Sequence, residues 1–307
     1  MKLKYLLLLI TLYGVAFANA QKVVFTPQWS AQTQFAGYYM AQAQGYYRAH
    51  GLTVEVVYPS RSENAFYYLK SGKAQFVTMN LSQAIYYKVH GADIVNVMQT
   101  SQVNSLMLVS HFPLPNFAAL QNRKLGIWNY LNQDFVNAVL SKYGVRANLV
   151  RFNSGVNVFL SGAVDACIIG SYNEYPQLLE CGYKIDPAYM MRLSDWGYKM
   201  PEEGVYVLRS YYEKNKETVK KFVEASKQGW QYTAGHVSEV VNYTMQYIKK
   251  YHIATNSYHQ RLMLDEVLRL QKDSRTGKRT FVLSPKDFET AMSFVSSKSI
   301  KYNDFVK

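Results

Sequence analysis

Four short stretches combine an aromatic ring with polar side chains where the chain is predicted to leave a strand. They are Gln28-Trp29, Trp128-Asn129-Tyr130, Tyr172-Asn173-Glu174-Tyr175 and Asp195-Trp196-Gly197. Ring faces hold a flat ligand, and a few polar groups orient it. Further hydrogen-bonding groups stand at other predicted loops, namely Asn80, Ser82 and Asn153. These residue types predict a site for a small aromatic molecule.

Glu174 has a second interpretation. It begins a predicted helix, where an acidic side chain also stabilises the helix dipole. Contact with a ligand and capping of the helix use the same position, so the sequence leaves both roles open.

Motifs for catalysis are absent from the sequence. It has no Gly-x-Gly-x-x-Gly, no Walker phosphate loop and no Gly-x-Ser-x-Gly elbow. Its six histidines show no i, i+4 pairing of the kind that binds metal. We therefore expect a protein that is not an enzyme, with no catalytic residues, no metal ligands and no cofactor.

The first predicted unit places Trp29 at the edge of a sheet. Val23–Phe25 reads as a strand, a helix opens near Gln32 and closes at Gly51, and Thr53–Val57 begins the next strand. Open α/β sheets bind ligands at the carboxyl ends of their strands, so Trp29 is predicted to form the floor of the site. The helix is expected to face the sheet with Phe35, Tyr39, Ala43 and Tyr46.

The rest of the chain divides at Pro113-Leu114-Pro115 into two α/β series, followed by a return strand at 204–208 and four helices. Strands are predicted at 75–79, 94–98, 106–109, 124–128, 149–152 and 165–169, in mostly parallel sheets. The run from Ser71 to Val77 is similar to the run from Ser161 to Cys167, which hints at an internal repeat. We expect two lobes with crossings near Val109–Pro113 and Glu202–Tyr206.

The amino terminus has the pattern of a signal peptide. Lys2 and Lys4 precede an apolar run at 6–10, and Ala18-Asn19-Ala20 offers a cleavage site before Gln21. The run is too short to span a membrane comfortably, and no cysteine near the cut would carry a lipid. We expect a soluble exported protein that is not lipid-anchored.

Charge and cysteine content give weaker information. The formal charge of +13 becomes +11 once Lys2 and Lys4 are removed, and the basic residues are scattered, which argues against a nucleic-acid partner. Cys167 and Cys181 are expected to be two buried thiols, although a disulfide is permitted in an oxidising compartment.

Across several of these stretches, the sequence resembles the periplasmic substrate-binding proteins related to the thiamine-pyrimidine synthases, the ThiY-like and SsuA-like proteins. The resemblance extends to about residue 235, and its order and spacing are more specific than any one motif. It rests on Gln28-Trp29, Gln34 to Tyr39, Gly45 to Tyr47, Gly51 to Val54, Leu69 to Gly72, Asn173-Glu174, Val205 to Val207, Lys221 to Val223 and Gly229 to Tyr232.

The resemblance implies the type II periplasmic-binding-protein fold, an α/β fold of two lobes with a ligand cleft and two hinge crossings. Residues 1–20 would be the signal peptide, 21–110 plus 205–307 the first lobe and 111–204 the second. It also implies a monomer in the periplasm that delivers a thiamine-precursor pyrimidine to the permease of an ABC importer at the inner membrane.

The ligand-binding residues follow from the aromatic pattern and the resemblance together. Trp29 would stack on the ring, while Asn173-Glu174 and the Asp195-Trp196 loop would reach it from the second lobe. The full candidate set is Gln28, Trp29, Gln34, Asn80, Ser82, Trp128, Tyr130, Asn153, Tyr172, Asn173, Glu174, Asp195 and Trp196.

Two alternatives differ in kind from an importer subunit. A sensor subunit that reports to a membrane receptor needs the same closing cleft. A pyrimidine synthase is disfavoured, because the synthase branch has a histidine-bearing loop and a Cys-rich iron run. Their counterparts here are Asn80-Leu81-Ser82, which lacks His, and Arg192 to Gly197, which lacks Cys.

Overall fold

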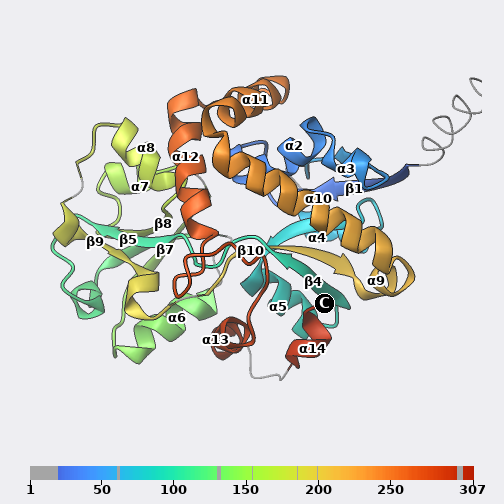
Figure 1. Ribbon diagram of the computed structural model, residues 1–307. Helices are drawn as coiled ribbons and strands as arrows, with labels where there is room; N and C mark the ends of the chain where they lie inside the picture. Colours follow the sequence, from blue (N-terminus) through green and yellow to red (C-terminus); the bar gives the residue numbers. More distant parts are fainter. Residues whose placement is uncertain are drawn as a thin grey trace, which may run out of the picture.

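The computed structural model describes residues 20–60, 63–129, 133–153, 155–184, 186–198, 200–295 and 300–307. These residues form two lobes, each with one five-stranded sheet (Figure 1). The first sheet has the order β2-β1-β3-β10-β4, with β1 at Gln21–Thr26, β2 at Leu52–Val56, β3 at Phe76–Asn80, β4 at Ile94–Gln99 and β10 at Glu203–Leu208. The second has the order β7-β6-β8-β5-β9, with β5 at Leu106–Ser110, β6 at Lys124–Trp128, β7 at Asn148–Phe152, β8 at Ala166–Gly170 and β9 at Met190–Arg192.

The two sheets share one topology. In each, a single strand runs against the others: β10 is antiparallel to β3 and β4, and β5 is antiparallel to β8 and β9. The remaining strands share a direction, as the alternation of strands and helices predicts. Strands β3 and β8, which follow the two similar sequence runs, hold the same place in their sheets. The carboxyl ends of β3 and β8 are therefore equivalent positions.

The first crossing between the lobes lies earlier than the sequence suggested. Strand β5 pairs with β8 and β9 of the second sheet, although the predicted boundary at residue 110 put it in the first lobe. The chain therefore passes between the sheets at 100–105 and again between Arg192 and Glu203. The prediction missed this because an apolar run such as Leu106–Val109 does not reveal which sheet it joins. Strand β9, a three-residue pairing with β5, had no sequence signal.

The helices cover both sheets and join the lobes. Around the first sheet lie α2 (Ala36–Ala43), α3 (Tyr46–Ala49), α4 (Ala65–Lys70), α5 (Leu81–Val89), α9 (Arg209–Lys214), α10 (Lys216–Gly235) and α11 (Val237–Lys250). The second lobe holds α6 (Gln133–Lys142), α7 (Asn157–Leu160) and α8 (Glu174–Glu180), and the carboxyl-terminal part holds α12 (Ser257–Leu270), α13 (Pro285–Val295) and α14 (Tyr302–Phe305). Short 3₁₀ helices are η1 (Thr33–Phe35), η2 (Phe117–Leu120), η3 (Pro187–Tyr189) and η4 (Leu193–Trp196).

The helix predicted from Gln32 to Gly51 is three pieces. It starts as η1, continues as α2 and breaks at Gly45, whose φ is +73°, before α3. Phe35 and Tyr39 are buried as expected, but Ala43 is exposed and Tyr47 is buried in place of Tyr46. The break at Gly45 shifts the apolar face, because a left-handed residue interrupts the 3.6-residue period.

Two glycines of the resemblance motifs serve packing. A Cβ added at Gly37 of α2 would lie 2.1 Å from the ring of Trp230 in α10, and one at Gly229 would lie 2.0 Å from the carbonyl oxygen of Gly37. Only hydrogen side chains permit such a close approach of two helices. This part of the family pattern therefore fixes α10 against α2.

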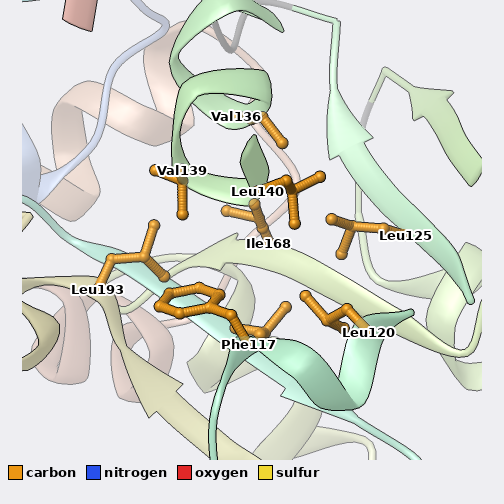
Figure 2. Close-up of a pocket in the computed structure, with 9 residues that line it drawn as sticks. Phe117, Leu120, Leu125, Val136, Val139, Leu140, Ile168 and Leu193 are labelled. Carbon is orange, nitrogen blue, oxygen red and sulfur yellow. The ribbon is translucent and has the colours of Figure 1, made fainter. Parts of the chain in front are cut away.

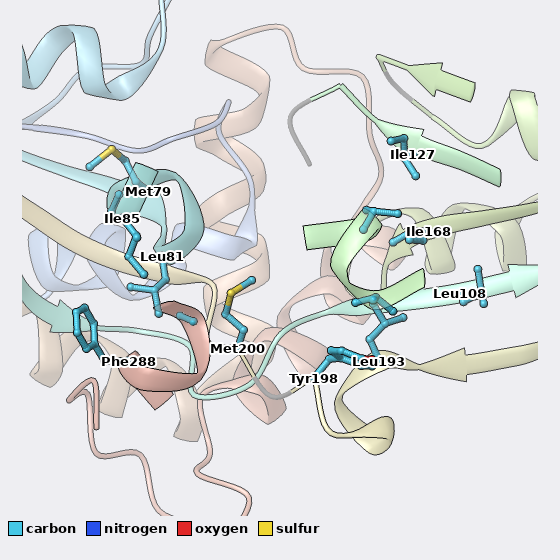
Figure 3. Packing of buried hydrophobic residues seen from close by; sticks show 14 of the residues in the cluster. Met79, Leu81, Ile85, Leu108, Ile127, Ile168, Leu193, Tyr198, Met200 and Phe288 are labelled. Atoms are coloured by element: carbon cyan, nitrogen blue, oxygen red, sulfur yellow. The ribbon is translucent and has the colours of Figure 1, made fainter. Parts of the chain in front are cut away.

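A continuous apolar core crosses from one lobe to the other (Figure 3). Met79 and Ile85 of the first lobe belong to the same cluster as Leu108 and Ile168 of the second, and Met200 lies between them. Helix α13 touches both α5 and α6, and α12 touches both α8 and η1. The lobes are thus joined by the two crossings and by these carboxyl-terminal helices.

Three other expectations have different outcomes. The predicted signal peptide spans residues 1–20, of which 1–19 lie outside the described residues, so it stays a prediction. Within the described ranges, no helix is long and apolar enough to cross a membrane. Cys167 and Cys181 are both free, but only Cys167 is buried; Cys181 is exposed at the end of α8, where no apolar layer covers it.

Candidate ligand-binding site between the lobes

A narrow pocket with about 20 Å³ of free volume lies where the two lobes meet. The carboxyl end of β3, both crossing segments, the loop after β8, the short η1 helix and the end of α12 all contribute to it. This free space is little more than one water molecule needs. The lining residues are Gln34, Asn80, Thr100, Ser101, Tyr172, Glu202, Glu203, Val267, Leu270 and Gln271.

The two crossings hold each other and position an acidic pair. Ser101 Oγ accepts hydrogen bonds from the backbone N–H groups of Glu202 (2.9 Å) and Glu203 (2.8 Å). In return, Ser105 donates to the Glu202 carboxylate from its backbone N–H (3.0 Å) and from its hydroxyl (3.2 Å). The acidic pair therefore stands at the crossings themselves.

Among the described residues, only one carboxylate oxygen of Glu203 has a hydrogen-bond partner. Gln34 Nε2 donates to Glu203 Oε2 at 2.8 Å, and Gln32 Nε2 in turn donates to Gln34 Oε1 at 2.5 Å. The other carboxylate oxygen, Glu203 Oε1, is buried without a hydrogen-bond partner among the described residues. The amide of Gln271, whose side chain is 1% exposed, also lacks partners at both atoms within the described ranges. Each such group costs about 1–3 kcal/mol of desolvation, so its presence calls for an explanation.

Glu174 approaches the pair from the second lobe. Its Oε2 accepts from the backbone N–H of Gly170 at 2.8 Å, and its Oε1 accepts from Asn173 Nδ2 at 2.5 Å. These bonds tie the end of β8 to the first turn of α8. The structure thus gives Glu174 a local structural role while it also faces the acidic pair.

Burial raises the pKa of all three carboxyls. The pKa of Glu203 rises to about 8, and the pKa values of Glu174 and Glu202 each rise to about 7. Burial comes first among the causes, and the neighbouring carboxylate adds to it for Glu202 and Glu203. The pKa of Tyr172 is raised by burial and by these same carboxylates. A buried acidic cluster in a cleft is a common mark of a functional site.

Three of the candidate residues line this pocket: Gln34, Asn80 and Tyr172. Gln28 stands directly behind, because its Nε2 donates to Asn80 Oδ1 at 3.3 Å. Asn173 and Glu174 directly follow Tyr172 in the chain, and the Glu174 carboxylate adds to the raised pKa of Glu202. These six residues come from both lobes, and their role in binding a ligand stays a prediction.

The remaining candidates do not line the pocket. Trp29 is 39% exposed in the loop after β1, and Ser82 is half-buried in the first turn of α5. Trp128 packs on Phe152, with ring centroids 5.0 Å apart, and Asn153 bonds to Asn129.

Asp195 and Trp196 are exposed on η4, where the Trp196 ring packs edge-on against Phe117. Asp195 faces Arg269 on α12, whose pKa it helps to raise after the larger effect of Glu266. Tyr130 lies outside the described residues.

Sequence reasoning missed the acidic pair and the end of α12. Glu202 and Glu203 stand at the predicted second crossing, and two adjacent acids in a chain with 21 acidic residues were a usable signal. Gln271 gave no signal, since a glutamine after a helix is ordinarily solvated. Among the described residues, no group of three or more His, Cys, Asp or Glu side chains is placed to hold a metal ion.

Two α/β lobes of shared topology, two crossings and a polar pocket between them define the class of the periplasmic binding proteins, the type II fold. The chain belongs to the NMT1/THI5-like family, whose sequence model matches residues 32–239. The family and the fold expected from the sequence are both confirmed.

The relatives have different named functions. The riboflavin-binding protein RibY of Chloroflexus aurantiacus is 26% identical over 272 residues, covering 84% of this chain and 75% of RibY. The 4-amino-5-hydroxymethyl-2-methylpyrimidine phosphate synthase of Candida albicans is 22% identical over 240 residues, covering 72% of this chain and 70% of the synthase.

Solved structures agree on the fold. The periplasmic aliphatic sulphonate binding protein SsuA of Escherichia coli superimposes with a TM-score of 0.63 at 15% identity, covering 80% of this chain and 83% of SsuA. The ligand-binding component of an ABC-type import system from Staphylococcus aureus, with zinc bound, gives a TM-score of 0.64 at 12% identity, covering 94% and 96%. At such identities the likeness shows the fold alone.

Proposed function

We propose that the protein is the exported ligand-binding subunit of an ABC-type importer, and that it binds a small aromatic, pyrimidine-like molecule between its lobes. The observation that carries this proposal is the polar pocket at the two crossings, with buried groups that lack partners. A cleft of this kind, placed where two lobes meet, is where such folds bind small molecules.

The aromatic character of the ligand rests on side chains that surround the pocket. Tyr172 lines it, and Trp29 follows Gln28, whose amide bonds to the pocket residue Asn80. Trp29 remains our candidate for stacking on the ring, since part of its surface is exposed at the carboxyl end of β1. The names of two relatives, which refer to riboflavin and to a pyrimidine phosphate, support a flat nitrogen heterocycle.

A ring-sized ligand needs the lobes to separate and close again. About 20 Å³ of free volume does not admit a pyrimidine, so entry requires motion about the two crossings. Contacts from α12 hold the present arrangement: Arg192 of β9 pairs with Glu266 at 2.8 Å, and His259 Nδ1 lies 3.1 Å from Glu180 Oε2 of α8. These contacts would form on closure.

The enzyme alternative has little support in the residues. Strand β3 ends at Asn80 and α5 begins with Leu81-Ser82, so the histidine of the synthase branch has no counterpart there. Carboxyls with raised pKa values can share a proton with a bound ligand, so these values do not by themselves indicate catalysis. Incubation of the purified protein with a pyrimidine substrate and a search for product tests this alternative.

A thermal-unfolding panel tests the binding function. The panel contains hydroxymethylpyrimidine, its formylamino relative, thiamine, riboflavin and an alkanesulfonate. A ligand at about 100 times its dissociation constant adds roughly 2.7 kcal/mol, which raises the midpoint by several degrees. We expect pyrimidines to raise it and Trp29→Ala to weaken their binding by about 1–3 kcal/mol. If no aromatic compound shifts the midpoint, the proposed ligand class is wrong.

A further inference from the structure

Two carboxyl groups line the pocket and a third lies beside them, and among the described residues no lysine or arginine shifts their pKa values. Glu202 and Glu203 line the pocket, and Glu174 faces Glu202 from α8. The groups that shift the pKa values of these carboxyls are each other, Ser105, Gln34, Asn173 and backbone N–H groups, all neutral donors or further acids. Once these carboxyls ionise, an anionic ligand placed here would meet like charge in a desolvated setting.

Other titratable groups around the cluster come from four elements. Burial raises the pKa of three phenols near the cluster, and the Glu203 carboxylate adds to this effect. They are Tyr38 of α2, Tyr206 of β10 and Tyr172 after β8. From α12, His259 reaches the cluster only through Asn173, with Nε2 at 3.1 Å from Asn173 Oδ1. Phenols at this range supply hydrogen bonds but no positive charge at neutral pH.

A second, independent observation points to a ligand with donors. Glu203 Oε1 and both amide atoms of Gln271 face the same pocket without hydrogen-bond partners within the described ranges. The side chains are 5% and 1% exposed, so bulk water does not satisfy them. The buried acceptors Glu203 Oε1 and Gln271 Oε1 are matched by N–H donors, and a charged donor makes the stronger bond, whereas Gln271 Nε2 is a donor that needs an acceptor on the ligand.

We propose that this pocket selects a ligand with a cationic nitrogen group, an aromatic amine or amidine, and that Glu203 and Gln271 form the subsite for that group. The inference rests on the proposed binding function and narrows its substrate class. The proposal predicts that this protein does not bind sulfonates, because a sulfonate would add a further anion beside the three carboxyls. An aminopyrimidine protonated at its ring nitrogen has an amidinium-like N–C–N edge with the required charge and donors.

Matched aromatic probes test the charge preference. Benzamidine, benzamide and benzoate have the same ring and carry positive, zero and negative charge. We expect isothermal titration calorimetry of the purified protein to show binding of benzamidine, weaker binding of benzamide and none of benzoate. Affinity for benzamidine should rise between about pH 6 and about pH 8.5, because the carboxyls must give up their protons to face a cation.

Variants locate the subsite. Glu203→Gln keeps the bond with Gln34 but removes the charge, and should weaken benzamidine binding at least about tenfold, the equivalent of one charged hydrogen bond. It should also flatten the pH dependence, whereas His259→Gln and the surface control Glu55→Gln should retain it. Gln271→Met should weaken benzamidine binding without flattening the pH dependence of the affinity. Circular dichroism verifies that each variant folds.

The opposite results would overturn the inference. Benzoate or ethanesulfonate binding as tightly as benzamidine would show that the cluster does not select a cation. So would binding of hydroxymethylpyrimidine that is unchanged by Glu203→Gln, although the binding function itself would then stand. If no probe and no compound of the thermal panel binds, the binding function fails together with this inference.

Discussion

Within the described part of the chain, one small pocket inside the second lobe and one between the lobes have opposite character. The first has about 10 Å³ of free volume and is lined entirely by apolar side chains, among them Phe117, Leu140 and Ile168 (Figure 2). The second has about 20 Å³ and is lined by Glu202, Glu203, Gln271 and other polar groups. The two pockets are therefore similar in volume but differ in the polarity of their lining.

The difference lies in what each lining leaves unsatisfied. An apolar void loses only dispersion contacts, and nothing in it needs a partner. A buried carboxylate oxygen or amide without a hydrogen bond costs free energy that a ligand can recover. This difference supports our proposal that the pocket between the lobes, and not the one inside the second lobe, binds the ligand.

Truncation in the apolar pocket should affect stability alone. Phe117→Ala removes a 2%-exposed ring that packs on Tyr143 and Tyr198. We expect the free energy of unfolding to fall by about 3–5 kcal/mol. Urea denaturation measures it, with Tyr258→Ala, at a 62%-exposed side chain, as a control that changes it by less than about 0.5 kcal/mol. If the folded variant binds ligand as tightly as the parent, the apolar pocket has no part in binding. A large loss of affinity would contradict the separate roles of the two pockets.

The stability of the unliganded protein should fall as pH rises from about 5 to about 8. The folded-state pKa values of Glu174, Glu202 and Glu203 lie at about 7, 7 and 8, above the ordinary value of 4.5. The folded state therefore holds more protons than the unfolded chain between these limits, and unfolding releases them as pH increases.

Thermal unfolding across this pH range measures the effect. Glu203→Gln should reduce the slope, while Glu55→Gln should leave it intact. At the acid end the sign reverses. Although burial opposes it, hydrogen bonds from Arg269 lower the pKa of Glu266 to about 2, so this carboxylate loses its contribution as pH drops from about 4.5 toward 2. Stability that rises steadily up to pH 8 would contradict the raised carboxyl pKa values.

Removing the unpartnered amide should stabilise the protein while it harms binding. Gln271→Met has a similar length and no polar amide, so the free energy of unfolding should increase by about 1 kcal/mol. Chemical denaturation without ligand measures the gain, and titration with hydroxymethylpyrimidine measures the loss. A variant that is less stable than the parent would mean that the amide is satisfied in solution.

The contact between α12 and β9 should give the smallest effect. Arg192 Nη1 lies 2.8 Å from Glu266 Oε1, and the Arg192 side chain is partly solvated. Arg192→Gln should lower stability by about 1 kcal/mol or less. Because this pair joins the lobes, small-angle scattering should show a larger mean dimension of the unliganded variant. The helix pair Arg261–Asp265 provides a matched control within one element, through Arg261→Gln.

Most of the strands and helices could be predicted from the sequence. Apolar runs bounded by turn residues located every strand except β9, and amphipathic spacing located the long helices α10 to α13 within a few residues. These signals are local, since burial of one face and the cost of a turn depend on neighbours in the chain. The sheet to which β5 belongs is not local, and the predicted boundary failed there.

The candidate site shows the same division. The search for polar and aromatic residues at strand ends selected Asn80 and Tyr172, which follow strands of two different sheets, whereas Gln34 of η1 was selected through the resemblance. The same rule also selected Trp128 and Asn153, which lie at the end of β6 and after β7, away from the pocket. A strand end is necessary for this kind of site, but the rule does not say which ends meet.

Local periodicity in the sequence is enough to predict the α/β alternation and the polar ends of strands β3 and β8, and the resemblance motifs are enough for the family and its two-lobed fold. Only the tertiary structure decided that Glu203 meets Gln34 across 169 residues and that Gln271 joins them at the end of α12. The physical reason is burial: a carboxylate or amide becomes a recognition group when distant segments remove its water, and no local pattern records which segments will do so.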